Sequence, residues 1–224
     1  MKFAAVAFDL DGTLYHDFSL FVRLVPFLLK NQRHLRAMGR ARNVLRETGS
    51  YEGDFYGTQA RLMGGFLDEP VEKVKEKTER LIYRGWERYF RDIRLFPHVR
   101  ETLGNFRKAG IKMGLLSDFP PENKLVNMKL DGYFETVICS EKTGRLKPDP
   151  LPFLELAARM KTEPQGILYV GNSVSYDVEG ARKVEMKTAL ICSVWRKFLL
   201  TAGKKAVADF CFSDYRQLCD YVLT

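Results

Sequence analysis

Two aspartates lie two residues apart directly after the first apolar run of the chain. The run ends at Phe8 and is followed by Asp9, Leu10, Asp11 and Gly12. Side chains at positions i and i+2 of a strand share a face, and the glycine indicates that the backbone is already turning there. The two carboxylates can therefore converge on one point, where carboxylates can divide the roles of nucleophile and general acid. Asx turns that cap the strand end are the structural alternative.

Five further polar residues lie beside other apolar runs. They are Ser117 and Asp118 after residues 112–116, Lys147 before a predicted helix, and Asn172 and Asp177 after residues 167–170. Each alone has an ordinary explanation as a helix cap, a loop residue or a charge near a helix N-terminus. The carboxyl ends of parallel strands meet at one edge of a sheet, where such folds bind ligands. The order of these residues therefore places all of them beside Asp9 and Asp11.

The segments that must position these residues alternate between strand and helix patterns. Six short apolar, β-rich runs are bounded by turn or polar residues: 3–8, 112–116, 136–139, 167–170, 188–191 and 210–212. Helical patterns separate the last five runs, for example at residues 121–130, 150–160 and 176–184. This alternation predicts an α/β fold with a doubly wound, mostly parallel, Rossmann-like sheet.

The alternation is interrupted between residues 15 and 94, which carry helix patterns and no convincing strand. The clearest helix is predicted to start at Asp68-Glu69-Pro70, with Val74, Ile82 and Trp86 among its apolar residues at helical spacing. A second predicted helix covers residues 32–46, with Gly49 as its stop. We therefore predict two domains, an α/β core of residues 1–15 and 95–224 and a helical domain of residues 16–94.

Residues 18–46 contain seven basic residues and no acidic one. Basic residues on one side of a helix usually form a solvated surface. A basic helix can also contact lipid, nucleic acid or a phosphorylated substrate. The whole chain has a formal net charge of +8, which favours anionic partners without choosing among them.

Length and composition exclude several classes of protein. The 224 residues are 46% hydrophobic and 29% charged, values that exclude a disordered or collagen-like chain. The four cysteines include no C-x-x-C pair, which excludes a zinc ribbon and a thioredoxin-type redox motif. No apolar run approaches the roughly 18 residues that a membrane span needs. We expect a cytoplasmic protein with no membrane partner.

In these residues the chain resembles the haloacid dehalogenase-like (HAD) superfamily. The four motifs of that family are D-x-D-G-T, a strand-terminal Ser or Thr, a Lys, and G-(D/N)-x-x-x-x-D. Residues 96–99, 107–112 and 180–182 are also similar to the segments around those motifs. The helical residues 16–94 are similar to the family's cap domain, which in relatives closes over the substrate and selects it.

The resemblance implies a magnesium-dependent phosphatase. Asp9 would be the nucleophile that forms an aspartyl phosphate, and Asp11 would be the general acid and base. Mg²⁺ would be held by oxygen ligands from Asp9, Asp11, Asn172 and Asp177. The substrate phosphate would be bound by Gly12, Thr13, Ser117, Asp118 (mainly through its backbone N–H) and Lys147. The expected substrate is a small phosphorylated metabolite, and no nucleic-acid partner is expected.

Two positions depart from the family pattern. Asn172 stands where most relatives have aspartate, so one negative charge is missing and weaker metal binding is expected unless Asp177 compensates. Glu185 stands where the family usually has glycine in a left-handed conformation, which costs on the order of 1 kcal/mol for another residue.

Two other functions remain open. A phosphosugar mutase would use the same Asp9 and Asp11 and would differ in how the cap excludes water. A binding protein with a basic cap and a weakened site would explain Asn172 and the charge of residues 18–46. Dehalogenation is disfavoured because that branch of the family lacks the second aspartate.

Overall fold

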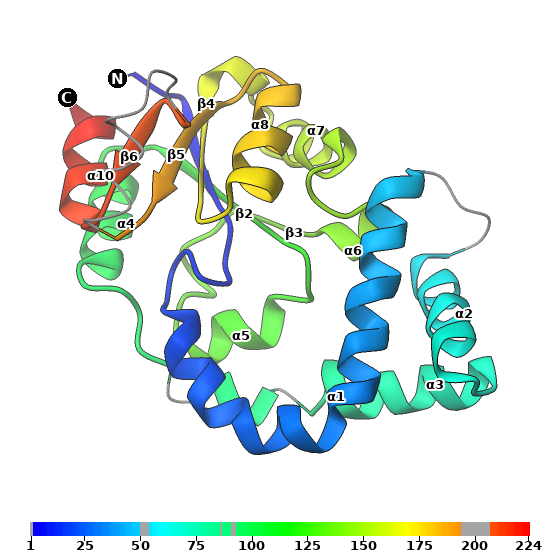
Figure 1. Cartoon of the computed structure of the whole chain (residues 1–224). Coiled ribbons are helices and arrows are strands. Elements are labelled where there is room, and N and C mark those ends of the chain that lie inside the picture. Colours follow the sequence, from blue (N-terminus) through cyan, green and yellow to red (C-terminus); the bar gives the residue numbers. More distant parts are fainter. Residues whose placement is uncertain (1, 50–53, 86, 91–92, 194–206) are drawn as a thin grey trace.

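The sheet lies at the centre of the molecule. The computed structural model describes residues 2–49, 54–85, 87–90, 93–193 and 207–224. The described strands form one parallel, six-stranded sheet in the order β3-β2-β1-β4-β5-β6 (Figure 1). Their bounds are β1 Ala5–Phe8, β2 Lys112–Ser117, β3 Thr136–Cys139, β4 Ile167–Gly171, β5 Lys187–Ile191 and β6 Phe210–Phe212. The predicted doubly wound α/β sheet is confirmed.

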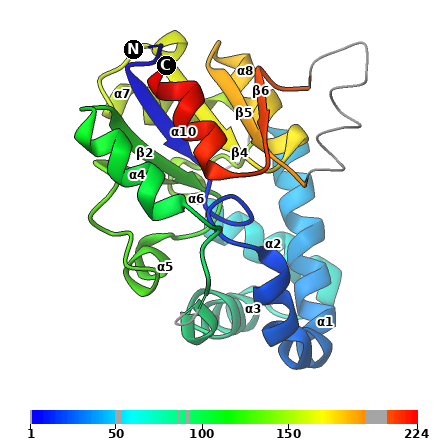
Figure 2. The same ribbon diagram turned by 90° about the vertical axis from the view of Figure 1, so that its left-hand side faces the viewer.

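Helices cover both faces of the sheet, which explains why the strands are apolar on both sides. Val6 and Phe8 of β1 pack in one cluster with residues of α4 (Val99–Lys108) and α10 (Tyr215–Leu223). Ala5 and Ala7 face the opposite side and pack against α7 (Pro150–Arg159) and α8 (Glu179–Lys183). Figure 2 shows these two helix layers on either side of the strands. Successive residues of β1 therefore supply two separate cores.

The register of the central strands aligns the loops that carry the predicted site. Phe8 of β1 pairs with Leu115 of β2 and with Val170 of β4. The residues that follow these three strands therefore leave the sheet at one edge. The shorter elements on this side are α5 (Glu122–Asn127), α6 (Ser140–Thr143) and the π-helical turn η4 (Val174–Val178), and η3 (Pro164–Gly166) precedes β4.

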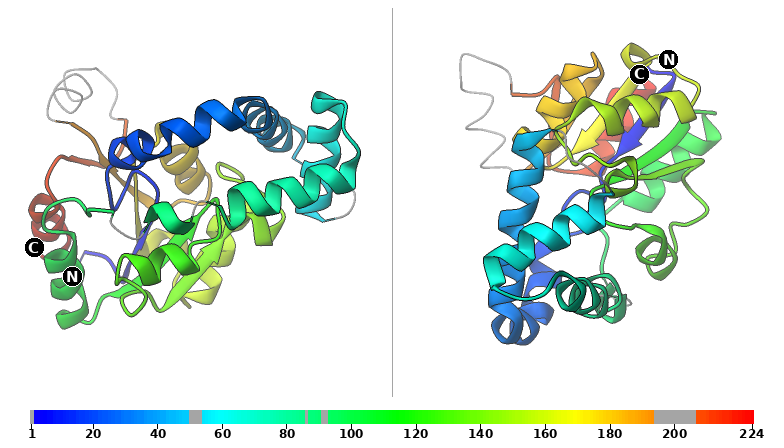
Figure 3. Two further views of the ribbon diagram at one scale, coloured as in Figure 1. Left: turned by 90° about the horizontal axis from the view of Figure 1, so that it is seen from below. Right: turned by 90° about the vertical axis from the view of Figure 1, so that its right-hand side faces the viewer.

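A group of helices, here called the helical insert, separates β1 from α4. It comprises α1 (Asp17–Thr48), α2 (Phe55–Leu67), α3 (Val71–Thr78), the π-helical η1 (Glu79–Tyr83) and η2 (Glu87–Phe90). Its own apolar cluster joins α1, α2, α3 and η1 through residues such as Ala41, Met63 and Ile82. Figure 3 shows these helices grouped beyond the carboxyl edge of the sheet. The domain boundary at residues 16–94 stays a prediction.

The structure contains the helices that the sequence predicts for the insert, but their first and last residues differ from the predicted ones. The helix predicted over residues 32–46 is the second part of α1, whose dihedral angles are non-helical at Asn31 and which ends at Gly49 with φ 62°. α3 begins at Val71, directly after the predicted start at Asp68-Glu69-Pro70, but it ends at Thr78, so the predicted apolar residue Ile82 lies in η1. Trp86 lies outside the described residues. Glu185 has φ 65°, so it adopts the predicted left-handed conformation. Among the described helices, none combines the length and hydropathy that a bilayer crossing requires.

Candidate active site

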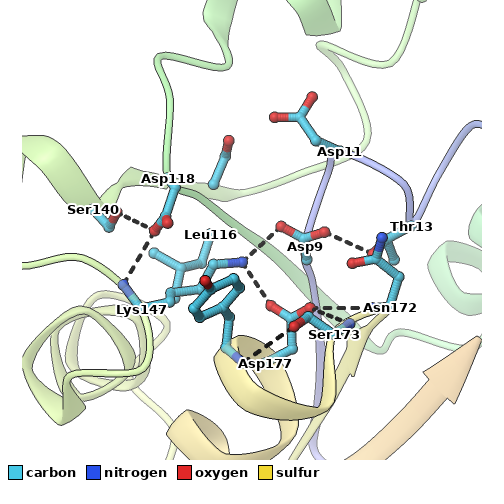
Figure 4. A network of polar contacts seen from close by, with 12 residues as sticks. Asp9, Asp11, Thr13, Leu116, Asp118, Ser140, Lys147, Asn172, Ser173 and Asp177 are labelled. Atoms are coloured by element: carbon cyan, nitrogen blue, oxygen red, sulfur yellow. Dashed lines mark hydrogen bonds and ion pairs between the residues drawn. The ribbon is translucent and has the colours of Figure 1, made fainter. Parts of the chain in front are cut away.

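Asp9 is the buried carboxylate at the end of the central strand. Its side chain follows β1 and is only 5% exposed. One carboxylate oxygen, Oδ2, accepts a hydrogen bond of 2.7 Å from the Thr13 hydroxyl. The other, Oδ1, lies 2.7 Å from the Lys147 ammonium (Figure 4). Gly12, which lies between Asp9 and Thr13 in the sequence, has φ 78°. This conformation favours glycine and lets the chain turn back so that Thr13 faces Asp9.

Lys147 lies between two carboxylates at the core of the site. Its ammonium is 2.7 Å from Asp9 Oδ1 and 2.7 Å from Asp177 Oδ1, and all three side chains are buried. Burial alone would lower the pKa of Lys147, but Asp177 and Asp9 together raise it well above its ordinary value. A fixed positive charge therefore lies directly beside the predicted nucleophile.

Burial raises the pKa of Asp9 to about 7, from an ordinary value of 3.8. Lys147 opposes this shift, whereas the nearby Asp177 and Asp11 add to it. A bound cation would favour the ionised form of the same carboxylate.

Asp177 fixes the loop that follows β4. Its Oδ2 accepts hydrogen bonds from the backbone N–H groups of Asn172, at 3.1 Å, and Ser173, at 2.9 Å. Its Oδ1 is occupied by Lys147. The Asn172 side chain is half-buried and, in Figure 4, points toward Thr13. Asp177 thus orients both Lys147 and the backbone that presents Asn172.

Asp11 points away from Asp9 (Figure 4), so the two carboxylates do not converge on one point as the sequence predicted. Both of its carboxylate oxygens lie 2.7 Å from the ammonium of Lys124, a buried residue of α5. The Tyr15 hydroxyl also donates to Asp11 Oδ1. The Lys124 ammonium lies 4.7 Å from the centroid of the Phe90 ring of the insert. Asp11 therefore lies on the side of the site that faces the insert.

Ser117 is the last residue of β2 and Asp118 follows it, and the two side chains have different roles. Ser117 is fully buried, and its Oγ accepts a hydrogen bond of 3.2 Å from the Phe119 N–H. The Asp118 carboxylate does not contact Asp9. Its Oδ1 accepts from the Ser140 hydroxyl at 2.6 Å and from the Lys147 N–H at 3.1 Å, and its Oδ2 accepts from Arg46 at 2.8 Å. The side chain of Asp118, and not only its backbone, thus organises the loops of the site.

The structure brings Asp9, Thr13, Lys147 and Asp177 into one contact network and places Asp11, Asp118 and Asn172 around it. Gly12 lies in the turn before Thr13, and Ser117 ends β2. Sequence reasoning missed the residues that support this set. They are Tyr15, Arg42, Arg46, Lys124, Ser140 and Glu141. The seven basic residues in 18–46 were a signal for Arg42 and Arg46, but that signal did not single them out.

Arg42 and Glu141 form a buried ion pair between the insert and the core. The side chains are 5% and 0% exposed, and the Tyr83 hydroxyl donates to the same carboxylate oxygen of Glu141 at 3.1 Å. The guanidinium carbon of Arg42 lies 4.1 Å from the centroid of the Phe119 ring. Part of the basic run is therefore used inside the chain rather than offered to an external anion.

The donor chemistry of the site fits Mg²⁺, because every polar group beside Asp9 that is able to bind a cation presents oxygen. The oxygens would come from the Asp9 carboxylate, the Asp11 carbonyl and the Asn172 amide. Asp177 Oδ2 accepts two backbone N–H groups and its Oδ1 faces Lys147, whereas each Asp9 oxygen accepts one hydrogen bond. This difference favours an orienting role for Asp177. Within the described ranges, no group of three or more His, Cys, Asp or Glu residues is arranged to hold a metal ion.

The raised pKa of Asp9 predicts a pH-dependent cost in stability. The folded protein keeps a proton on Asp9 that the unfolded chain loses above about pH 4, so this stabilisation is lost as pH rises toward 7 and beyond. Between pH 5 and 8 the loss is about 3 kcal/mol in the free energy of unfolding. Asp9→Asn removes this component. Its free energy of unfolding, relative to the parent, should therefore rise by that amount over the same interval.

Urea unfolding of both proteins at pH 5 and 8, with a chelator present, measures this difference. Asp131→Asn, a matched change at an exposed residue, should show no such pH dependence. An equal effect of Asp9→Asn at the two pH values would contradict the prediction.

The sequence was also compared with protein families and with known proteins. The family model for haloacid dehalogenase-like hydrolases matches residues 3–185. Phosphoglycolate phosphatase of Escherichia coli (strain K12) is 30% identical over 197 residues, which cover 79% of this chain and 76% of that protein. Glyceraldehyde 3-phosphate phosphatase of Pyrococcus furiosus is 33% identical over 138 residues, covering 60% of this chain and 52% of that protein.

Solved structures show the same fold. A HAD phosphatase from Thermococcus onnurineus superposes with a TM-score of 0.65 at 24% identity, covering 100% of this chain and 98% of that one. L-2-haloacid dehalogenase from Xanthobacter autotrophicus superposes with a TM-score of 0.68 at 18% identity, covering 98% of each chain. With the family model matching most of the sequence, the chain belongs to the haloacid dehalogenase-like hydrolases and is an enzyme of that family.

Proposed function

We propose that this hydrolase is a magnesium-dependent phosphatase that cleaves small organic phosphate monoesters through an aspartyl phosphate on Asp9. The observation that carries the proposal is the position of Asp9, which is buried at the carboxyl edge between the Lys147 ammonium and the Thr13 hydroxyl. Support also comes from the two phosphatases at about 30% identity. A cytoplasmic location is part of the same proposal.

The difficulty of the reaction explains why several groups are needed. Uncatalysed hydrolysis of phosphate monoesters requires accelerations of up to about 10²¹-fold, whereas general acid–base catalysis alone contributes about 10² to 10⁴. Bound Mg²⁺ would neutralise charge on the phosphoryl oxygens. A covalent step on Asp9 and tight positioning would supply the remainder.

The reaction would proceed in two displacements. An Asp9 oxygen forms a bond to phosphorus while the ester P–O bond breaks, and Asp11 gives its proton to the departing alkoxide. Water then attacks the aspartyl phosphate, Asp11 takes a proton from that water, and inorganic phosphate leaves with Asp9 restored. Lys147 and the backbone N–H groups of Gly12 and of the Ser117–Asp118 turn would hold the phosphoryl oxygens.

A small cavity beside Lys124, the partner of Asp11, suggests a small leaving group. A cavity of about 70 Å³ lies between the insert and the core and is lined by residues that include Tyr83, Phe90, Phe119 and Lys124. Lys124 is the residue that pairs with Asp11, so this cavity adjoins the predicted general acid. We therefore take the helical insert to be the cap. Phosphoglycolate and glyceraldehyde 3-phosphate, the substrates named by the two relatives, are the first candidates.

A panel of phosphorylated metabolites, assayed for phosphate release with Mg²⁺ and with a chelator, tests the proposal. We expect hydrolysis of small monoesters that Mg²⁺ restores after chelation. A mutase would instead give an isomerised phosphosugar without release of stoichiometric phosphate. If no monoester is hydrolysed, or if the chelator has no effect on hydrolysis, the proposal is wrong.

A further inference from the structure

Arg46 lies where the helical insert meets three loops of the carboxyl edge. It belongs to the C-terminal part of α1, which rises beside α6 in Figure 1. Its Nη2 donates to Asp118 Oδ2 at 2.8 Å, and its Nε donates to the Lys147 carbonyl oxygen at 2.9 Å. Its guanidinium carbon is 4.4 Å from the centroid of the Tyr176 ring. A planar guanidinium can bind acceptors along its edge while it stacks on a ring, so one insert residue contacts all three loops.

This arrangement holds both backbone polar groups of Lys147. Asp118 Oδ1 accepts the Lys147 N–H at 3.1 Å, and Arg46 donates to the Lys147 carbonyl. The Ser140 hydroxyl fixes the same Asp118 oxygen at 2.6 Å. From this held backbone, the Lys147 side chain reaches Asp9 at 2.7 Å. The position of the ammonium beside the nucleophile therefore depends on a contact that the insert supplies.

We infer that Arg46 is a positioning residue that couples the seating of the helical insert to the placement of Lys147. The inference rests on the proposed function, in which Lys147 stabilises the transferring phosphoryl group. When the insert is seated, Arg46 and Asp118 together fix the Lys147 backbone. Any displacement of the insert would separate Arg46 from both partners and leave the Lys147 backbone without that support. The buried pair of Arg42 and Glu141 secures the same contact surface.

Arg46→Met tests the inference, because it keeps an apolar stem and removes both donors. Its matched control is Arg36→Met, which removes the same charge from an exposed position on the same helix. Displacement of a group that acts in the transition state by about 1 Å costs up to about 10²-fold, so we expect kcat of Arg46→Met to fall about 10- to 100-fold. KM should change by less than about threefold, because the lost interaction acts in the transition state, and Arg36→Met should resemble the parent. Arg46→Lys, which can reach only one acceptor, should have an intermediate kcat.

A double-variant cycle with Asp118→Asn tests the route of the coupling. Residues that act through one shared network show non-additive effects. The combined Arg46→Met and Asp118→Asn variant should therefore have a kcat close to that of the single variant with the lower kcat. Independent effects that multiply, a change confined to KM, or an unchanged kcat in Arg46→Met would each overturn the inference.

Thermal unfolding of every variant separates loss of folding from loss of positioning. If Arg46→Met does not unfold cooperatively, Arg46→Lys replaces it with the same expected direction. A parent that hydrolyses no monoester would refute the proposed function. An active parent whose Arg46 variants match Arg36→Met would refute only the role of Arg46.

Discussion

Asp9→Asn should reduce phosphate release by about 10⁴-fold or more, which is the scale seen when a catalytic nucleophile is removed. An amide has nearly the volume of a carboxylate but cannot form the aspartyl phosphate. Since the carboxylate is buried with a raised pKa, the free energy of unfolding of Asp9→Asn relative to the parent should also rise between pH 5 and pH 8. Steady-state assays on the best substrate of the panel, combined with urea unfolding, measure both effects.

The control for this change is Asp131→Asn, which makes the same replacement at an exposed position. Its turnover should match that of the parent. Loss of activity in Asp9→Asn without loss of folding separates a chemical role from a structural one. Substantial hydrolysis by a folded Asp9→Asn protein would refute the assignment of Asp9.

Lys147→Met should damage both stability and turnover. It leaves Asp9 and Asp177 buried without the cation that lies 2.7 Å from each. Removal of one partner from a buried ion pair typically costs about 3–5 kcal/mol in the free energy of unfolding. Loss of one group that stabilises charge in the transition state costs about 10²- to 10³-fold in kcat. Urea unfolding and steady-state assays of the folded variant measure the two losses.

The stability loss should also depend on pH. Because it comes from ionised carboxylates left without a partner, it should be smaller at pH 5 than at pH 8. Lys142→Met is the control, since Lys142 forms an exposed ion pair with Glu122 and should lose no more than about 1 kcal/mol. Equal losses at Lys147 and Lys142 would contradict the role given to the buried triad.

The sheet could be predicted because its strands are short apolar runs bounded by turn or polar residues, and all but β6 are buried over most of their length. Strand 5–8, for example, is buried along its whole length, so it can be recognised as a continuous apolar run without knowledge of the strands beside it. The course of α1 was harder to predict. Only its second part, after the non-helical Asn31, has a regular apolar pattern, while Pro26 lies inside its first part. The packing of that first part depends on tertiary contacts.

The residues of the site likewise divide into those that the local sequence places and those that tertiary contacts place. Asp9, Thr13 and Asp177 are each placed by a strand end or by a short local motif, so the topology brings them together, and Lys147 joins them from the loop before α7. The supporting contacts are different. Arg42 and Glu141 are 99 residues apart, and Arg46 and Lys147 are 101 residues apart. These contacts depend on where the insert sits on the core, and no local pattern in the sequence encodes that position.

The contacts of the Asp118 carboxylate could not be predicted for the same reason. Its place after β2 predicted a backbone N–H near the phosphate, but its carboxylate binds Arg46, Ser140 and the Lys147 backbone. Those partners come from three different segments of the chain. A carboxylate with so many partners in other segments is recognisable only after the fold is known.

Mass spectrometry of the enzyme quenched in acid during turnover tests the central claim most directly. With Mg²⁺ and a good monoester substrate, the peptide that contains Asp9 should gain the mass of one phosphoryl group. That gain should be lost after hydroxylamine treatment, as expected of an acyl phosphate, and should be absent from Asp9→Asn. An active enzyme that is trapped with the phosphoryl group on another residue would contradict the account.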